Sequence, residues 1–346
     1  MGRRIQVLVV DDSKLARDLI IEILSGDDEI AVIGTAKNGR EAVERTRDLK
    51  PDIVTIDIEM PVMNGLEAIE RIMASHALPI LVVTTRGDAQ PAYAAISKGA
   101  LDVVMKPDVR NNGPREFISK IKLLSKIKVI THLGGRHAAR RVSDTPSLFR
   151  GKTSDRAVAI ASSTGGPEAL SVILSGLPGN FPCPVIIAQH NADGFIPGMV
   201  EWLGKISRNP VTVAVEGEQV VPGTVYVSPS EKHLEVSGVN TVSLIERRPG
   251  DLYHPSCDRL LSSVARVYGA LGIGVILTGM GSDGVLGVRA IRAAGGATIA
   301  QDEQSSIVFG MPKVAIETGC IDRILPLEEI SGHLLHLVNS AQTLSK

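Results

Sequence analysis

Apolar and polar positions over the first 106 residues alternate between short apolar runs and helical patterns. Segments between the runs, such as LARDLIIEIL and GLEAIERIMA, place apolar residues three or four positions apart and predict helices. Strands that alternate with helices in this way form a parallel sheet covered on both faces. The apolar runs predict five strands, over residues 6–10, 30–36, 52–57, 80–85 and 102–106.

A further helix is predicted over residues 111–132. Its apolar residues recur at helical spacing and Pro114 suits its first turn. These apolar residues are Phe117, Ile118, Ile121, Leu124 and Ile127. The helix would complete an N-terminal domain over residues 1–132.

A second alternation of strands and helices begins at RAVAIA, and it predicts another α/β domain with a more mixed sheet, over residues 156–346. Residues 133–155 lose the apolar periodicity and are rich in Gly, Ser, Thr and Pro, which predicts a linker. The strand candidates of this second domain cover residues 156–161, 184–190, 211–215, 224–229, 233–236, 241–246, 272–279 and 297–301.

Composition narrows the class of protein. Apolar residues make up 44% of the chain and charged residues 22%, as in folded globular proteins. Lys and Arg (37) balance Asp and Glu (38), so no basic field is expected to hold a nucleic acid. The six-residue apolar stretch near the N-terminus is too short for a signal peptide or a membrane span. Three separated cysteines predict neither a disulfide framework nor a zinc site, and we expect a cytoplasmic protein.

Three carboxylates lie at predicted strand ends in the N-terminal domain. Asp11 and Asp12 follow the first strand and Asp57 ends the third, so they should converge at the carboxyl edge of the sheet. Oxygen ligands packed this closely favour a hard cation such as Mg²⁺. Thr84 and Lys106, at two more strand ends, suit the binding of a phosphoryl group. The alternative is that the Asp and Thr residues only cap helices.

These residues resemble the response-regulator receiver family over residues 1 to about 125. The motifs that carry the resemblance are Asp11-Asp12, Asp57, Met60-Pro61, Gly65, Thr84 and Lys106-Pro107. The resemblance implies a flavodoxin-like five-stranded parallel sheet and a histidine kinase as phosphodonor. It also implies that Asp57 is the phosphoacceptor, that Thr84 and Lys106 contact the phosphoryl group, and that the backbone carbonyl of Glu59 joins Asp11, Asp12 and Asp57 around Mg²⁺. The family often has an aromatic switch residue where this chain has Val103.

A candidate nucleophile lies in the segment RAVAIASSTGGPEAL, which predicts a buried strand, a sharp turn with two glycines and a helix. Ser163 lies at the turn, as in a nucleophile elbow, and the amide of Thr164 would face a developing oxyanion. The alternative is a capping or phosphate-binding turn.

A serine needs a base, and His190 is the best placed of the eight histidines because it ends a predicted strand. Asp283, in the glycine-rich loop after residues 272–279, would orient the imidazole. The same loop, Gly279 to Gly284, also fits the G-x-G-x-x-G pattern of a dinucleotide-binding fold. A dinucleotide-dependent enzyme and a non-catalytic signalling adaptor therefore stay as alternatives.

The second domain resembles the chemotaxis protein-glutamate methylesterase family, whose catalytic domain is a doubly wound α/β fold. The resemblance rests on Ser163-Thr164-Gly165-Gly166, Gln189-His190, Pro255-Ser256 with Asp258, Leu277 to Gly281 with Asp283-Gly284, Gln301-Asp302-Glu303, and Gly310-Met311-Pro312. It departs at Asn191-Ala192-Asp193-Gly194-Phe195, where the family usually reads Met-Pro-Pro-Gly-Phe.

This second resemblance implies that Ser163 rather than Ser162 is the nucleophile, that His190 is the base and Asp283 the orienting acid, and that the amide of Met280 joins the oxyanion hole. The implied reactions are hydrolysis of glutamate methyl esters on the cytoplasmic domains of methyl-accepting chemoreceptors and deamidation of selected receptor glutamines. A chemotaxis histidine kinase would be the phosphodonor. No cofactor is expected in the catalytic domain.

Overall fold

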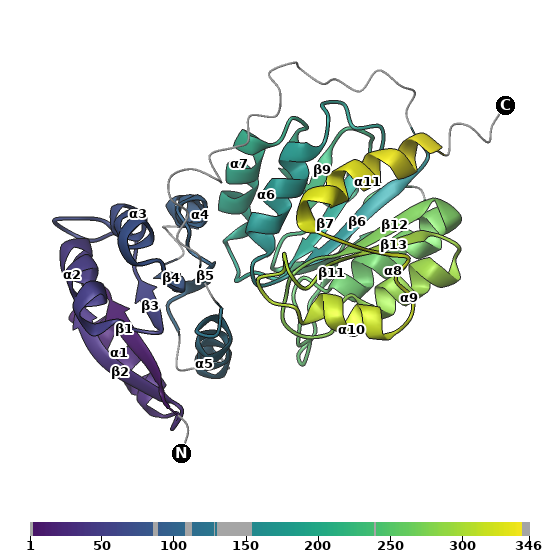
Figure 1. Cartoon of the computed structure of the whole chain (residues 1–346). Helices are drawn as coiled ribbons and strands as arrows, with labels where there is room; N and C mark the ends of the chain where they lie inside the picture. The colour runs from purple at the N-terminus through teal and green to yellow at the C-terminus, as the bar shows by residue number, and fades with distance from the viewer. Residues whose placement is uncertain are drawn as a thin grey trace. The chain divides into compact units, whose positions relative to one another are not determined.

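The computed structural model describes residues 3–85, 89–107, 113–127, 129, 154–238 and 240–340. The chain divides into two compact units, Met1–Arg141 and Val142–Lys346 (Figure 1). Nearly all of the predicted linker, 133–155, lies outside the described residues, so the domain boundaries stay predictions. In the described part, no helix has the length and apolar character needed to span a membrane.

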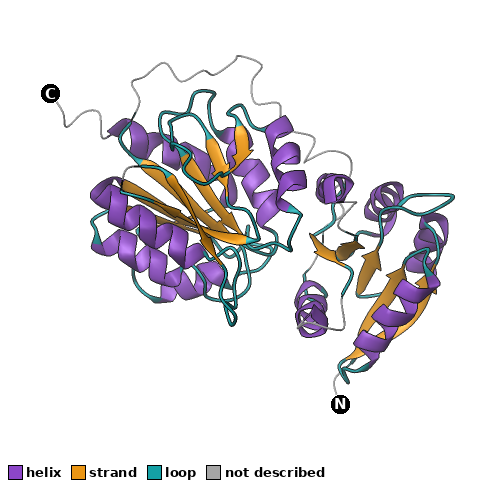
Figure 2. Ribbon diagram, turned by 180° about the vertical axis from the view of Figure 1, so that it is seen from behind, coloured by secondary structure: helices purple, strands orange, loops and turns teal. Residues whose placement is uncertain are grey.

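The N-terminal unit is a five-stranded parallel sheet in the order β2-β1-β3-β4-β5, with helices on both faces (Figure 2). Helix α1 contacts α5, whereas α2 contacts α3 and α3 contacts α4, which gives the two helical layers. The five-stranded parallel sheet predicted from the sequence is therefore confirmed. The elements are β1 (Ile5–Val10), α1 (Lys14–Ser25), β2 (Ile30–Ala36), α2 (Gly39–Leu49), β3 (Ile53–Ile56), α3 (Gly65–His76), β4 (Ile80–Thr84), α4 (Ala89–Ser97), β5 (Asp102–Met105) and α5 (Gly113–Leu124).

Helix α5 is shorter than the sequence predicts. The apolar residues Phe117, Ile121 and Leu124 are buried as expected, but the helix ends at Leu124 instead of continuing toward residue 132. The amides of Lys126 and Ile127 bond to carbonyls three residues back, the tighter pattern typical of a helix end. The predicted span was too long because apolar spacing continues past the point where the backbone leaves the helix.

The C-terminal unit is built on a seven-stranded sheet in the order β14-β13-β12-β6-β7-β9-β8, in which every pairing is parallel. The prediction of a mixed sheet is wrong, because the antiparallel strands β10 and β11 pair with each other as a separate hairpin. The elements are β6 (Ala157–Ser162), α6 (Gly166–Gly176), β7 (Val185–Gln189), α7 (Ile196–Ile206), β8 (Val211–Val213), β9 (Val225–Val227), β10 (Lys232–Val236), β11 (Val242–Glu246), α8 (Cys257–Tyr268), η2 (Gly269–Leu271), β12 (Gly272–Ile276), α9 (Val285–Ala293), β13 (Ala297–Gln301), α10 (Met311–Glu317), β14 (Arg323–Leu325) and α11 (Leu327–Ser340).

The strand order of this sheet has a topological switch point at its centre. Helices α6, α7 and α11 cover one face, and α8, α9 and α10 cover the other (Figure 1). Strand β6 lies between β7 and β12. From β6 the chain adds β7, β8 and β9 on one side of it, and it later adds β12, β13 and β14 on the other side. At such a topological switch point the loops after neighbouring strands diverge and leave room for a ligand. The loops after β6, β7 and β12 therefore meet at one place.

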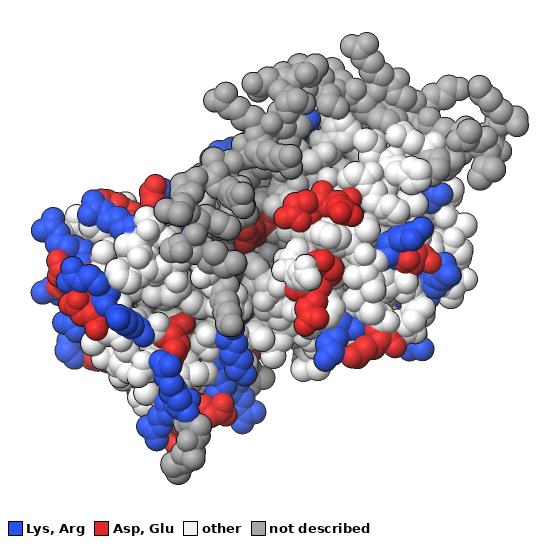
Figure 3. All heavy atoms as spheres, in the orientation of Figure 1, with Lys and Arg blue, Asp and Glu red and all other residues white. Residues whose placement is uncertain are grey.

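Charged side chains of both signs are interspersed over the faces visible in Figure 3. Several form pairs one helical turn apart, such as Lys14 with Asp18, Glu67 with Arg71, and Glu201 with Lys205. Exposed pairs of this kind contribute little to stability, and they mark solvated helix faces.

Candidate functional site

The predicted acidic cluster forms at the carboxyl edge of the N-terminal sheet. Val10 and Ile56 are in register on the adjacent strands β1 and β3, so Asp11 and Asp57, which follow them, lie side by side. Ligand atoms of Asp11, Asp12 and Asp57 lie within 4.8 Å of one another. Asp11 and Asp57 are buried, whereas Asp12 is exposed.

Lys106 completes this cluster. Its Nζ lies 2.8 Å from Asp11 Oδ2 and 2.6 Å from Asp57 Oδ2. Burial raises the pKa of Asp57 by more than the hydrogen bond from Lys106 lowers it. Burial lowers the pKa of Lys106, but its contacts with the carboxylates of Asp11 and Asp57 outweigh this effect and raise it. The amide of Lys106 donates to Thr84 O at 2.9 Å, so the ends of β4 and β5 lie together, and the Thr84 side chain is buried there.

The three carboxylates fit a hard divalent cation. Asp11 Oδ2 is buried and in ionic contact with Lys106, but no aligned hydrogen bond from a described residue satisfies it. An oxygen ligand in that state is available for a metal such as Mg²⁺. Glu59 follows β3 with an exposed side chain, and the role of its carbonyl stays a prediction. Val103, in place of an aromatic switch residue, is buried in β5.

The structure separates the two candidate serines of the C-terminal unit. Ser162 ends β6 in register with Gln189 of β7, and its buried Oγ donates to Gln189 Oε1 at 2.6 Å. Ser163 lies in the turn before α6 and is partly exposed; in the described residues its Oγ has no hydrogen-bond partner. A hydroxyl that is accessible can approach a substrate carbonyl, whereas the buried and bonded Ser162 Oγ cannot, so the geometry favours Ser163.

His190 and Asp283 form a direct pair next to Ser163. His190 directly follows β7, its amide donates to Ser162 O at 3.0 Å, and its Nε2 lies 2.8 Å from Asp283 Oδ2. The imidazole also stacks on Tyr253, with ring centroids 5.2 Å apart and planes 10° apart. Since Asp283 occupies Nε2, Nδ1 is the nitrogen left to act as a base.

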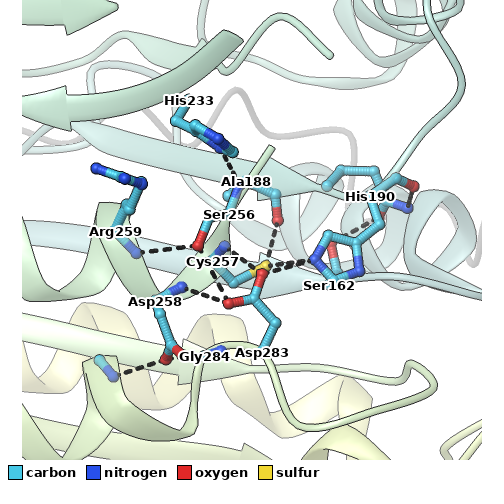
Figure 4. A network of polar contacts seen from close by, with 12 residues as sticks. Ser162, Ala188, His190, His233, Ser256, Cys257, Asp258, Arg259, Asp283 and Gly284 are labelled. Atoms are coloured by element: carbon cyan, nitrogen blue, oxygen red, sulfur yellow. Dashed lines mark hydrogen bonds and ion pairs between the residues drawn. The ribbon is translucent and has the colours of Figure 1, made fainter. Parts of the chain in front are cut away.

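Asp283 is buried but remains an anion. Burial acts to raise the pKa of this carboxyl, but the His190 contact and the amides of Cys257 and Asp258 outweigh burial and lower it. These amides lie in the first turn of α8 and donate to Asp283 at 2.6 and 2.9 Å (Figure 4). A helix N-terminus thus holds the carboxylate that orients His190.

Asp258 makes the reciprocal contact. Its Oδ1 accepts hydrogen bonds of 2.9 Å from the amides of Gly284 and Gly287 at the start of α9. Asp283 therefore caps α8, whose first turn contains Asp258, and Asp258 caps α9, which follows Asp283; these contacts hold the Asp283 loop against α8. Burial raises the pKa of Asp258 by more than these amides lower it.

The amides predicted for an oxyanion hole are available. Among the described residues, none accepts a hydrogen bond from the amide of Thr164 or of Met280. Gly279, which precedes Met280, packs so tightly on Ser163 that an added Cβ would lie 2.7 Å from Ser163 Cβ. The Gly279 amide is already bonded to Val308 O and Asp283 is bonded to His190, so this loop forms no dinucleotide cradle.

Three neighbours of His190 or Asp283 were missed in the sequence. Tyr253 stacks on the His190 ring, Cys257 places its buried Sγ 3.4 Å from His190 Nε2, and Ser256 Oγ lies 3.3 Å from Asp283 Oδ1. Burial raises the pKa of the Cys257 thiol well above its usual range. The Pro255-Ser256 motif marked this segment, but its contact with Asp283, 27 residues later, left no pattern in the sequence.

Comparison with known proteins agrees with this geometry. Residues 158–334 match the CheB methylesterase family, and residues 7–113 match the response regulator receiver domain. The chain belongs to the CheB methylesterase family. A Paramagnetospirillum magneticum relative, "Protein-glutamate methylesterase/protein-glutamine glutaminase 3", is 47% identical over 98% of this chain and 97% of its own. A similarly named Pyrococcus abyssi protein is 38% identical over 97% of this chain and 94% of its own.

The catalytic unit also resembles a solved structure. The Thermotoga maritima CheB methylesterase catalytic domain is 39% identical and gives a TM-score of 0.52, covering 53% of this chain and 98% of that chain. The predicted doubly wound α/β class of the second domain is confirmed, and with it the predicted family.

Proposed function

We propose that this chain is a protein-glutamate methylesterase and protein-glutamine glutaminase whose activity is regulated by phosphorylation of its receiver domain. The observation that carries the proposal is the His190–Asp283 pair at the end of β7, next to the turn after β6 that holds the partly exposed Ser163. Relatives that carry the same two activities in their names match the chain over nearly its whole length.

In the proposed reaction, His190 Nδ1 takes the proton of Ser163 as Oγ attacks the carbonyl carbon of the ester. His190 Nε2–H donates to Asp283 Oδ2, which fixes the tautomer and stabilises the imidazolium that forms. The amides of Thr164 and Met280 hold the oxyanion of the tetrahedral intermediate. The proton then passes from His190 to the departing methoxide, which leaves as methanol.

The resulting acyl-enzyme is hydrolysed by the same groups. His190 removes a proton from water, which attacks the acyl carbon, and Ser163 Oγ leaves and regains its proton. A glutamine side chain follows the same path with ammonia as the leaving group, so one site serves both activities. We propose no metal or cofactor for this unit.

In the receiver domain we propose Asp57 as the phosphoacceptor. Asp11, Asp12 and Asp57, with the backbone carbonyl of Glu59, would hold Mg²⁺, which offsets negative charge on the phosphoryl group when bound. Thr84 and Lys106 would contact the phosphoryl oxygens. The proposed phosphodonor is a chemotaxis histidine kinase, and the proposed substrates are the cytoplasmic domains of methyl-accepting chemoreceptors, which places the reaction in the cytoplasm.

The test compares Ser163→Ala with Ser162→Ala by methanol release from methylated receptor membranes. Ser163→Ala should lower turnover by about 10⁴-fold or more and leave the melting temperature close to wild type, since it removes only the nucleophilic oxygen. Ser162→Ala should lower stability, because it breaks the buried bond to Gln189, and should retain the acyl-enzyme chemistry. The reverse pattern would assign the nucleophile to Ser162, and methanol release by Ser163→Ala at the wild-type rate would contradict the proposal.

A further inference from the structure

His233 is a second buried histidine close to the catalytic pair, and the proposed reaction does not use it. It lies in β10, is 1% exposed, and its two ring nitrogens are both engaged. Nδ1 accepts the backbone N–H of Ser256 at 2.9 Å, and Nε2 lies 2.8 Å from Asp251 Oδ2. Burial with both nitrogens paired indicates a ring held in one orientation.

The hydrogen-bond partners fix the tautomer of His233. A backbone N–H can only donate, so Nδ1 must be unprotonated, and the ring proton lies on Nε2 and points to Asp251. Asp251 suits this role, since the Arg248 amide and the contact with His233 lower its pKa and keep it ionised. His233 is therefore a neutral acceptor aimed at one backbone amide.

That amide belongs to the residue that connects His233 to the catalytic carboxylate. Ser256 is the N-cap of α8, and its Oγ lies 3.3 Å from Asp283 Oδ1 as a donor (Figure 4). The next two amides, of Cys257 and Asp258, donate to Asp283 as well. Three consecutive residues thus hold the carboxylate, and His233 holds the first of them.

Strand β10, which carries His233, is held against α8 by side-chain contacts. Glu235 pairs with Arg259 at 3.1 Å and with Arg266 at 3.0 Å, and the amide of Val236 donates to Ser263 Oγ at 2.9 Å. These contacts fasten β10 along α8 at points farther along the helix than Ser256. Because several contacts hold the hairpin β10–β11 against α8, the loss of a single one far from Ser256 should leave His233 beside the first turn of the helix.

We propose that His233 is a positioning residue for the hydrolytic reaction: through Nδ1 it fixes the first turn of α8, and this turn fixes Asp283 and thereby His190. The proposal rests on the proposed function of the site. His233 does not touch the substrate or the reacting atoms. Its loss should lower kcat, because misplacement of Asp283 weakens the stabilisation of the imidazolium, and should leave KM close to wild type.

Two substitutions distinguish the two hydrogen bonds that the His233 ring makes, one through Nδ1 and one through Nε2. Asparagine places its Oδ1 near the position of Nδ1 and can still accept the Ser256 amide, whereas glutamine reaches toward Asp251 and leaves that amide without its acceptor. We expect His233→Gln to lower kcat about tenfold, by analogy with the roughly 10- to 100-fold losses seen when a residue that orients a metal ligand is removed. We expect His233→Asn to stay within about twofold of wild type. Methanol release from methylated receptor membranes by the full chain gives kcat and KM.

Two further measurements distinguish positioning from general support of the fold. Adding His233→Gln to Asp283→Asn should lower kcat no further, because the effect passes through Asp283. Ser263→Ala, which breaks another link between β10 and α8, should lower the melting temperature and leave kcat unchanged. If His233→Gln does not fold, Ser256→Ala tests the next step of the path, because it retains the backbone bond to His233 and removes the hydroxyl that donates to Asp283. It should lower kcat and leave KM unchanged, and wild-type kcat in this variant would contradict the proposed path.

Equal losses in His233→Gln and His233→Asn, or a loss that persists in the Asp283→Asn background, would overturn the proposal. So would wild-type kcat in His233→Gln. Wild-type protein without methylesterase activity would instead contradict the proposed function, so the two failures are distinguishable.

Discussion

The charge of Asp283 is maintained by its hydrogen-bond donors rather than by solvent. The side chain is almost fully buried. Its two oxygens accept hydrogen bonds from His190, from Ser256 Oγ and from two backbone amides. A carboxylate with several donors is stabilised in its ionised form even away from water. Because this pairing also fixes which nitrogen of His190 is the base, the same contacts that preserve the charge prepare the ring for catalysis.

Asp283→Asn is predicted to lower both turnover and stability. The amide favours the wrong His190 tautomer, and in the serine-protease example of the corresponding change turnover falls about 10⁴-fold. The free energy of unfolding at pH 7 should fall by about 1–3 kcal/mol, because buried charge-assisted hydrogen bonds are weakened.

The pH dependence of that stability loss follows from the lowered pKa of Asp283. Since the pKa in the folded chain lies below the ordinary value of 3.8, the carboxylate stabilises the fold fully above pH 3.8 and less as pH falls through its folded-state value. Urea unfolding of wild type and variant should therefore show a difference at pH 7 that shrinks below pH 3.8. A difference that stays constant down to pH 2 would contradict an ionised Asp283.

The sequence predicts Ser163 and His190 directly after strands and Asp283 in the loop after another strand. The structure brings His190 and Asp283 together because the loops after neighbouring parallel strands meet by the geometry of the sheet alone. The sequence could not place Tyr253 against His190, since that contact depends on how a long loop folds back over the sheet. His233 was predicted in a strand over residues 233–236, and the structure has it in β10. The alternation in KHLEV puts His233 on the same side as Glu235, so it gives no sign that His233 is buried.

At the level of elements, the loop after β7 is tied down by polar contacts on both sides. The carboxylate of Asp193 accepts hydrogen bonds from both Nη atoms of Arg247, at 3.0 and 2.8 Å. The amide of Gly194 donates to Glu231 Oε1 at 2.8 Å. Arg247 and Glu231 also line a cavity of about 500 Å³. This chain has Asp193 where its family usually has proline, so an ion pair takes over the role of a stiff backbone.

Arg247→Ala is predicted to raise KM for methylated receptor by about threefold to tenfold with little change in kcat, since a bidentate pair orders the loop that follows His190. The matched control is Arg248→Ala, which removes the same charge next in the chain and should leave KM near wild type. Asp193→Ala combined with Arg247→Ala should be no worse than Arg247→Ala alone. Equal effects of the two arginine variants would show that charge, and not the pair, is responsible.

Element boundaries and sheet composition were predicted less well than element type. The hairpin β10–β11 was read correctly as two strands, but no pattern in HLEV or TVSLIE tells whether they join the main sheet. Their partner choice depends on packing against α8, through Glu235, Arg259 and Ser263, which are distant in sequence. The predicted length of α5 was wrong for a local reason: Ile127 continues the apolar spacing beyond the last helical turn.

At the scale of the whole molecule, two units of different chemistry share one chain. The receiver unit has a cluster of three carboxylates with Lys106. The catalytic unit has a serine site, and among its described residues no three carboxylates gather in this way. Curated relatives match across both units, over up to 98% of this chain, so the pairing of the two is a property of the family. A chemical change at Asp57 is therefore expected to regulate Ser163, and this coupling can be tested without separating the units.

Asp57→Asn is predicted to abolish stimulation by a small phosphodonor with Mg²⁺ and to leave the basal rate of methanol release within about twofold of wild type. The amide is a poor nucleophile and a poor metal ligand, and the basal site lies in the other unit. Asp48→Asn is the matched control, because Asp48 is an exposed receiver carboxylate that pairs with the adjacent Arg47, and it should be stimulated like wild type. Stimulation that persists in Asp57→Asn, with phosphate found on Asp11 or Asp12, would show that the acceptor is misassigned. Wild-type protein that takes up phosphate on Asp57 without any change in methanol release would show that the two units are not coupled.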